Sequence, residues 1–122
     1  VERQLRELDG RRLVAAQPFV EAHALRHVVD LDPRRLARIA RRYDVLTREG
    51  NGASRRTLAE AGVKEAHLAI ACTSRDETNL VAAMFSKKLS PRTTSVMRAS
   101  NVEYLELWRE GQLDVDFIVS AE

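Results

Sequence analysis

The sequence predicts an α/β domain, an open and doubly wound sheet of mostly parallel strands with helices on both faces. Apolar runs alternate with helix-like segments from residue 26 onward, which is the order of βαβ units. Residues 67–72 form an apolar run without polar alternation, as in strands covered on both faces. A polar turn and a helix follow this run directly, and doubly wound sheets bind ligands at such junctions.

Composition restricts the classes of protein to which the chain can belong. Its 122 residues suit a single domain, which would bury about two-thirds of its unfolded surface. Twenty basic residues nearly match eighteen acidic ones, so the net charge of +2 does not indicate nucleic-acid binding. The single cysteine excludes an internal disulfide, and the spacing of the three histidines predicts no metal site. No apolar run reaches the length of a membrane span.

The first 25 residues have the weakest pattern. Residues 1–9 predict a frayed helix, and residues 11–16 predict a short strand. Pro18 suits the first turn of a short helix over 19–25. Because the chain begins with Val1 and ends just after a strand-like run, we expect it to be a fragment of a longer protein.

Two strands and two helices are predicted next. The strands are 26–32 and 43–47, and the helices are one that begins at Pro33 and one over 55–61. Asp32 and Ser54 directly precede these helices, where a side-chain oxygen can accept hydrogen bonds from free N–H groups. Gly62 follows the second helix and suits a left-handed residue at its C-terminal end.

The rest of the chain continues the alternation. The predicted strands are 67–72, 93–97 and 116–119, and the predicted helices are 76–89 and a segment that ends at Arg109. Acids in the first turn and lysines in the last suit the dipole of the first helix. Ser100 or Asn101 caps the second helix, with Leu105 and Trp108 facing inward and Gly111 ending it.

Asp30 is the most specific single residue, because it stands at the end of a predicted strand. In dinucleotide-binding folds a carboxylate at this place accepts hydrogen bonds from the ribose of the adenosine half. A carboxylate would repel a phosphate on that ribose, so NAD is favoured over NADP. The alternative is that Asp30 or Asp32 only caps the next helix, and for Asp32 capping is the favoured interpretation.

Two loops at strand ends are further candidates for nucleotide contacts. The small residues Asn51, Gly52 and Ala53 would let the backbone approach a flat adenine ring, or they form only a turn with positive φ at the glycines. Thr73 and Ser74, with the free N–H groups of the next helix, could face a pyrophosphate or nicotinamide, or they only cap that helix.

Glu77 and Asn79 follow this turn and could hold it in place. Arg98, at the next strand end, could pair with a phosphate or with Glu122, or it is a surface arginine. Cys72 is interpreted as a core residue, because no basic side chain stands beside it in the sequence to activate its thiol. We find no convincing acid–base pair or nucleophile, so the sequence does not predict an enzyme.

Four stretches together resemble one family closely. They are VVDLDPRRL (28–36), YDV…GNGAS (43–54), LAEAGVKEAHLAIACTSRDETNLVAAMFSKKL (58–89) and RASNVEYLEL (98–107). The chain is similar to the N-terminal, NAD-binding domain of Trk-type potassium-uptake regulators, the TrkA-N family with the RCK/KTN fold. This similarity is nearly continuous over 26–122, and it implies a Rossmann-like sheet.

The resemblance also implies a regulatory function rather than catalysis. Families of this kind bind NAD(H) or adenine nucleotides such as ATP and ADP, and they pair as homodimers or higher oligomers. They gate a membrane potassium channel or transporter subunit from the cytoplasm, at the inner face of the cell membrane. The family's site residues fall on the ribose acid Asp30, the adenine loop 51–53, the phosphate-side Thr73, the helix start at Glu77 and Asn79, and Arg98.

One departure from the family concerns its first strand, which should be followed by G-x-G-x-x-G. Gly10 is the only glycine before Gly50, and residues 11–26 are too short for a strand, a glycine loop and a full helix. Those glycines let the backbone approach the pyrophosphate. We therefore divide the chain into an atypical first βα unit, degenerate or truncated, at 1–25 and a nucleotide-binding domain at 26–122.

Residues 13–16 could still fill the centre of the sheet, and otherwise two apolar strand edges would be exposed. Two other functions remain open from the sequence. One is a fragment of an NAD-dependent oxidoreductase, which would need a substrate domain and an acid–base residue. The other is a dimerisation module that has kept the fold and lost its ligand, which the missing glycines favour.

Overall fold

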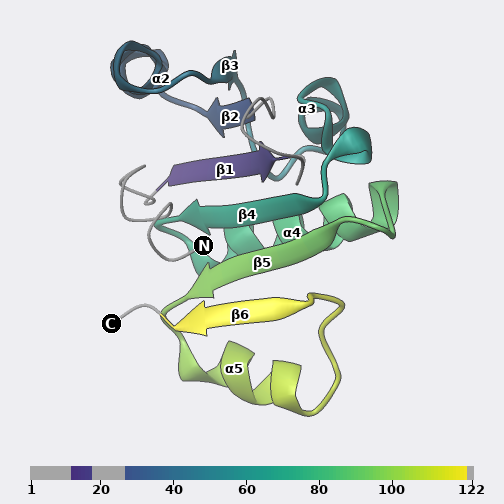
Figure 1. Cartoon of the computed structure of the whole chain (residues 1–122). Coiled ribbons are helices and arrows are strands. Elements are labelled where there is room, and N and C mark those ends of the chain that lie inside the picture. Colours follow the sequence, from purple (N-terminus) through teal and green to yellow (C-terminus); the bar gives the residue numbers. More distant parts are fainter. Residues whose placement is uncertain (1–11, 18–26, 121–122) are drawn as a thin grey trace.

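The computed structural model describes residues 12–17 and 27–120. These residues form a sheet with the strand order β3-β2-β1-β4-β5-β6 (Figure 1). The strands are β1 (Arg12–Gln17), β2 (His27–Asp30), β3 (Leu46–Glu49), β4 (Leu68–Thr73), β5 (Thr94–Ala99) and β6 (Phe117–Ser120). This is the order of dinucleotide-binding sheets, in which the order reverses beside the first strand.

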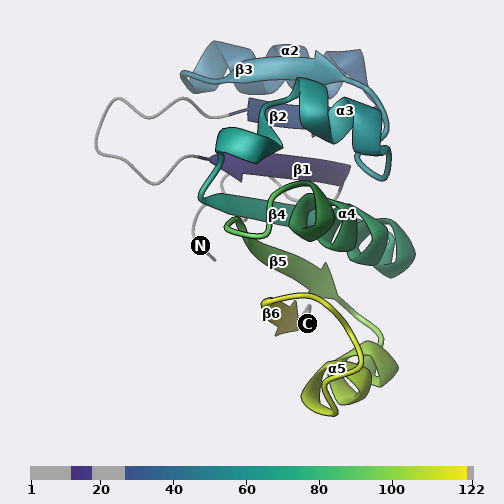
Figure 2. The same ribbon diagram turned by 90° about the vertical axis from the view of Figure 1, so that its right-hand side faces the viewer.

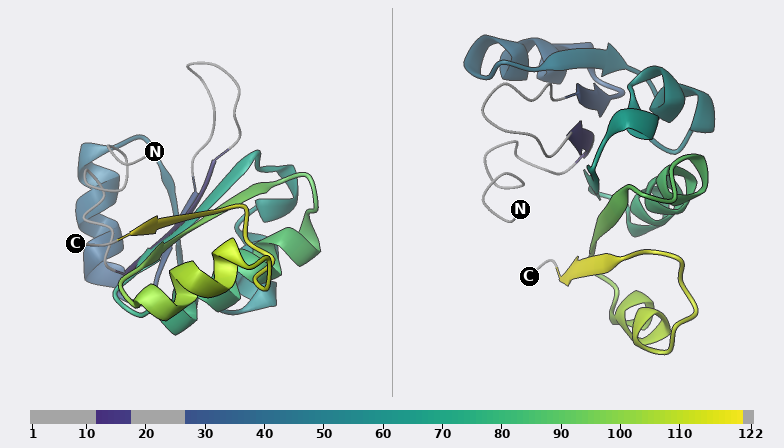
Figure 3. Two further views of the ribbon diagram at one scale, coloured as in Figure 1. Left: turned by 90° about the horizontal axis from the view of Figure 1, so that it is seen from below. Right: turned by 45° about the vertical axis from the view of Figure 1, so that its right-hand side comes forward.

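Helices cover both faces of the sheet, as the sequence predicts. They are α2 (Pro33–Arg42), α3 (Arg55–Glu60), α4 (Asp76–Leu89) and α5 (Val102–Arg109), with a short 3₁₀ helix η1 (Val63–Glu65). In the left view of Figure 3, α2 lies on one side of the sheet and α4 and α5 lie on the other. The α/β prediction is therefore confirmed. None of the helices in the described ranges is a candidate membrane span.

The orientation of β1 separates this sheet from an all-parallel one. The pairs β2–β3, β4–β5 and β5–β6 are parallel, whereas β1 is antiparallel to both of its neighbours. Figure 2 shows β1 between β2 and β4, and in Figure 1 its arrow points the opposite way to theirs. The predicted strand at 13–16 thus fills the centre of the sheet, and the first unit is atypical in its direction.

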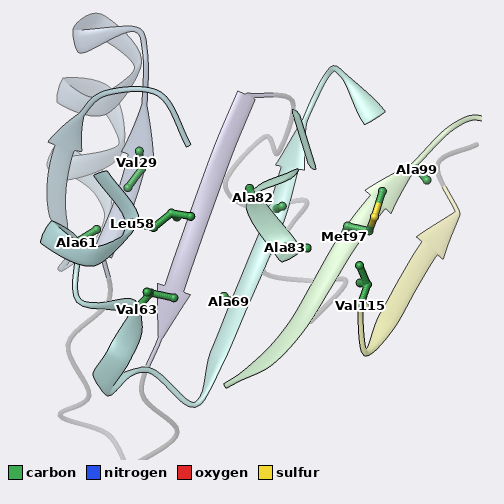
Figure 4. Close-up of a cluster of buried hydrophobic side chains, with 11 residues drawn as sticks. Val29, Leu58, Ala61, Val63, Ala69, Ala82, Ala83, Met97, Ala99 and Val115 are labelled. Carbon is green, nitrogen blue, oxygen red and sulfur yellow. The ribbon is translucent and has the colours of Figure 1, made fainter. Parts of the chain in front are cut away.

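Alternating side chains of the strands build two apolar cores. The core toward α3, α4 and α5 includes Val29, Leu58, Val63, Ala83 and Met97 (Figure 4). The core toward α2 includes Val28, Leu36, Ile39, Ile70 and Cys72. Cys72 is fully buried, which agrees with its interpretation as a core residue.

The helix ends follow the local rules that the sequence indicates. Asp32 Oδ1 accepts from Arg34 N, Ser54 Oγ accepts from Thr57 N, and Asn101 Oδ1 accepts from Glu103 N. Each of these bonds satisfies an N–H group that has no partner within the helix. Gly62 has a φ of 91°, as expected for a left-handed residue after a helix.

Some predicted bounds were wrong. The strand predicted at 43–47 is β3 at Leu46–Glu49, because Tyr43 N still donates to Ile39 O and so belongs to the end of α2. The last strand begins at Phe117 rather than at 116. Leu105 and Trp108 are only partly buried, but Trp108 packs against the core as expected. The helices predicted over 1–9 and 19–25 lie outside the described residues.

Asp116 ties the loop before β6 to α4 and β5. Its Oδ2 atom lies 2.8 Å from Lys87 Nζ and 2.9 Å from Ser95 N. Burial raises the pKa of Asp116, but the hydrogen bonds from Lys87 and Ser95 outweigh burial, and the pKa lies below its ordinary value. The folded state therefore favours the ionised carboxylate.

We expect Asp116→Asn to lower the free energy of unfolding by about 1–2 kcal/mol at neutral pH, because it removes charge-assisted hydrogen bonds. The lowered pKa means that the stabilisation exists above the unfolded pKa and is lost as the pH falls through the folded value. Urea unfolding at neutral and acidic pH measures the difference. Asp114→Asn, at an exposed neighbour, is the control. An equal and pH-independent effect of both substitutions would contradict this prediction.

Candidate functional site

A cavity of about 170 Å³ opens where the loops after β2, β3 and β4 meet. Because β2 and β4 are both antiparallel to β1, they run in the same direction and end at the same edge of the sheet. The cavity is lined by Leu31, Gly50, Asn51, Gly52, Thr73, Ser74, Arg75 and Thr78. The loop at 50–52 and the Thr73 turn therefore border one cavity, whereas Asp30 is not among its lining residues.

Asn79 fixes the Thr73 turn. Its Oδ1 atom accepts hydrogen bonds from Thr73 N at 2.7 Å and from Thr73 Oγ1 at 2.6 Å. Its Nδ2 atom donates to the carbonyl oxygens of Thr73 at 3.0 Å and of Arg98 at 2.9 Å. Asn79 is fully buried, so these bonds satisfy both ends of its amide. One side chain thus joins the ends of β4 and β5 to α4.

The glycine-containing loop is shaped by an Asn turn rather than by left-handed glycines. Asn51 Oδ1 accepts from Ala53 N at 2.8 Å, and Gly50 N donates to Asp30 O at 2.9 Å. Positive φ was expected at Gly50 and Gly52, but neither adopts it. Glycine at position 50 allows close packing instead, because a Cβ there would lie 3.0 Å from the Thr57 methyl group.

The carboxylate of Asp30 is enclosed. Asp30 is 1% exposed, its Oδ1 atom accepts from Asp32 N at 2.8 Å, and its Oδ2 atom lies 3.4 Å from Arg35 Nε. The positive charge of Arg35 offsets the negative charge of Asp30, which was expected to repel a phosphate on the ribose. Leu31, which is 65% exposed, forms the cavity wall beside this strand end.

The structure separates the candidate residues into two groups. Asn51, Gly52, Thr73 and Ser74 line the cavity, whereas Asp30, Asp32, Ala53, Glu77, Asn79 and Arg98 are absent from its lining. Asp32 caps α2, which is the interpretation that the sequence favours. Asn79 holds the Thr73 turn as expected, and the carbonyl of Arg98 is one of its acceptors.

Glu77 connects α4 to α5 rather than to the cavity. Its Oε2 atom accepts from Tyr104 Oη at 2.9 Å, and this hydrogen bond is the main reason that the pKa of Tyr104 is raised. Asp76, which the sequence analysis did not single out, accepts from Ser100 N and Asn101 N at 2.9 Å and 2.7 Å. Both first-turn acids of α4 therefore bind the start of α5.

Four lining residues were not among the predicted site residues: Leu31, Gly50, Arg75 and Thr78. Their positions in the sequence could have predicted them. Leu31 follows a strand end, Arg75 continues the Thr73 turn, and Thr78 lies one helical turn beyond Ser74. Among the described residues that line the cavity, Arg75 is the one charged residue, and its positive charge suits an anionic ligand.

The lining fits half of a dinucleotide and not the whole of one. Small and polar residues from three loops suit an adenosine moiety, but G-x-G-x-x-G is absent before Gly50, and β1 runs in the reverse direction. These residues do not fit the pyrophosphate loop that NAD requires. Among the described residues there is also no group of three or more His, Cys, Asp or Glu that could hold a metal ion.

Known proteins of one family resemble this chain in sequence. A family model described as the TrkA-N domain matches residues 13–121. The "Trk system potassium uptake protein TrkA" of Haemophilus influenzae is 29% identical over 99 residues, which is 78% of this chain and 22% of that protein. The proteins of the same name from Halomonas elongata and Azorhizobium caulinodans are 32% and 33% identical, over 98 and 100 residues.

The match to these relatives is partial. It covers 78% of this chain in both of the latter cases, and 21% and 22% of the relatives. The chain thus spans about a fifth of the length of the curated relatives it matches.

We expect Asn79→Ala to lower the free energy of unfolding by about 2–4 kcal/mol, because it leaves several buried backbone groups of β4 and β5 without partners. Urea unfolding followed by circular dichroism measures this loss. Lys88→Ala, at an exposed position of the same helix, is the control and should change the stability by less than about 0.5 kcal/mol. Equal stability of the two variants would contradict the assigned bridge.

Proposed function

The chain belongs to the TrkA-N domain family, and we propose that it is a regulatory adenine-nucleotide-binding domain of a potassium-uptake system. Its curated relatives are named Trk system potassium uptake proteins. The observation that best supports nucleotide binding is the cavity at the carboxyl edge of the sheet. In doubly wound folds this edge is where ligands bind.

The proposed ligand contacts two parts of the domain at once. One wall of the cavity comes from Leu31 and the loop at 50–52, and the other comes from the Thr73 turn and Thr78 in α4. A flat base lying between them would draw the two walls together. Ligands with such a base are NAD(H), ATP and ADP. A ligand that binds one conformation of the domain more tightly than another would shift the population toward that conformation.

Contacts from α4 to α5 provide a path from the cavity to the surface. Asp76 binds the backbone at Ser100 and Asn101, and Glu77 binds Tyr104. A displacement of the first turn of α4 would therefore move α5. We propose that a homodimer or higher oligomer passes this change to a membrane channel or transporter subunit at the cytoplasmic face of the membrane.

A dimerisation module that has lost its ligand is the second candidate. Two observations favour it: the glycine motif is missing, and the Asp30 carboxylate is already engaged by Arg35. An oxidoreductase fragment has less support, because the cavity lining contains no acid–base pair. Stable dimers in light scattering, without nucleotide binding, would favour the dimerisation module.

We expect Thr78→Phe to weaken nucleotide binding at least about tenfold, because the aromatic ring would occupy the cavity. Isothermal titration with ATP, ADP, NAD and NADH measures the affinity. Lys88→Phe places the same ring at an exposed site of α4 and should leave the affinity unchanged. No saturable binding and no thermal shift of the unmodified chain with any of these compounds would refute the nucleotide proposal.

A further inference from the structure

We propose that the cavity binds the adenosine monophosphate half of a nucleotide and gives no binding energy to the second half of a dinucleotide. This inference rests on the proposed function, since it concerns the ligand of the same cavity. NAD(H) and AMP would then bind this chain with nearly equal affinity. A domain that binds the whole dinucleotide would instead bind NAD(H) more tightly than AMP.

The register of β1 is the first observation. Arg12 pairs with Thr73 and Gln17 pairs with Leu68, so β1 starts at the cavity edge and ends at the opposite edge. On its other side, Ala16 pairs with His27, the first residue of β2. The last residue of β1, Gln17, and the first residue of β2, His27, therefore both lie at the edge away from the cavity.

This connectivity removes the usual site for a pyrophosphate. A dinucleotide fingerprint needs glycines directly after the first strand and then a helix whose N-terminus faces the phosphates. The chain leaves β1 at the wrong edge for such a turn, and residues 18–26 contain no glycine. Among the residues that the structure describes, the second phosphate and the nicotinamide half thus lack their usual binding partners.

The size of the cavity agrees with a half-sized ligand. Its volume of about 170 Å³ is below the range of about 300–1,000 Å³ that is typical of pockets for drug-sized ligands. The loop at 50–52 and the Thr73 turn supply small residues on two sides. A base with its ribose is the part of a dinucleotide that matches this lining.

Arg75 is suited to a single phosphate at the cavity. It lines the cavity and offers hydrogen-bond donors that pair with phosphate oxygens. The nearby acids would oppose a phosphate, but Asp76 is held by Ser100 and Asn101 and Glu77 by Tyr104, all at the α5 side. We therefore place the phosphate of the bound mononucleotide against Arg75.

Isothermal titration of the unmodified chain with AMP, ADP-ribose, NAD and nicotinamide mononucleotide tests the inference. We expect AMP, ADP-ribose and NAD to bind with dissociation constants within about threefold of one another. Nicotinamide mononucleotide should not displace bound AMP. NAD binding more than about tenfold tighter than AMP would overturn the inference and leave nucleotide binding intact. Absence of binding by all four compounds would refute the inference, and it would refute the proposed function as well if ATP and ADP also fail to bind.

Arg75→Ala tests the position of the phosphate. We expect it to weaken AMP binding about tenfold and to leave adenosine binding unchanged, because only AMP has a phosphate to pair. Arg92→Ala, at an exposed site before β5, is the matched control and should change neither affinity. An unchanged ratio of AMP to adenosine affinity in Arg75→Ala would overturn the assignment of the phosphate to Arg75.

Discussion

The sheet depends on the position of β1, which pairs with β2 along one edge and with β4 along the other. Without β1, two buried strands would each present a row of unpaired N–H and C=O groups, which favours aggregation. With it, the pair β3–β2 and the set β4–β5–β6 form one sheet. Because β2 and β4 are both antiparallel to β1, their C-terminal ends lie at a common edge, where the cavity forms.

Two polar contacts then fix the strand ends around the cavity. On one side, Asn79 bonds Thr73 and Arg98, so β4, β5 and α4 share one buried amide. On the other side, Asp30 accepts from the backbone of Asp32, and its carboxylate pairs with Arg35 of α2. Neither Asn79 nor Asp30 lines the cavity itself, so both contacts support its walls from outside the lining.

The sequence predicted the local features of this fold well and one global feature poorly. Helix caps such as Asp32 and Ser54, and the chain reversal at Gly62, follow from the chemistry of single residues. An apolar run such as 13–16 has the same pattern in either direction, so composition could not give the polarity of β1. Length could have given it, since parallel strands need connections of about a dozen residues or more, and only residues 18–26 separate β1 from β2.

The candidate site was partly predictable for a related reason. Strand ends identified the Thr73 turn and the loop at 50–52, because Thr73 directly follows an apolar run and the loop follows the strand predicted at 43–47. The pairing of Asp30 with Arg35 was not foreseen, since it depends on how α2 packs against β2. Which acids face the cavity and which face α5 also depends on packing, as Asp76 and Glu77 demonstrate.

The direction of β1 is the claim on which the account depends, and nuclear Overhauser contacts between backbone protons measure it most directly. The account predicts contacts between Arg12 and Thr73 at one end of the strand pair and between Gln17 and Leu68 at the other. Contacts of Arg12 with Leu68 and of Gln17 with Thr73 would show a parallel strand. They would contradict both the architecture described here and the ligand inferred from it.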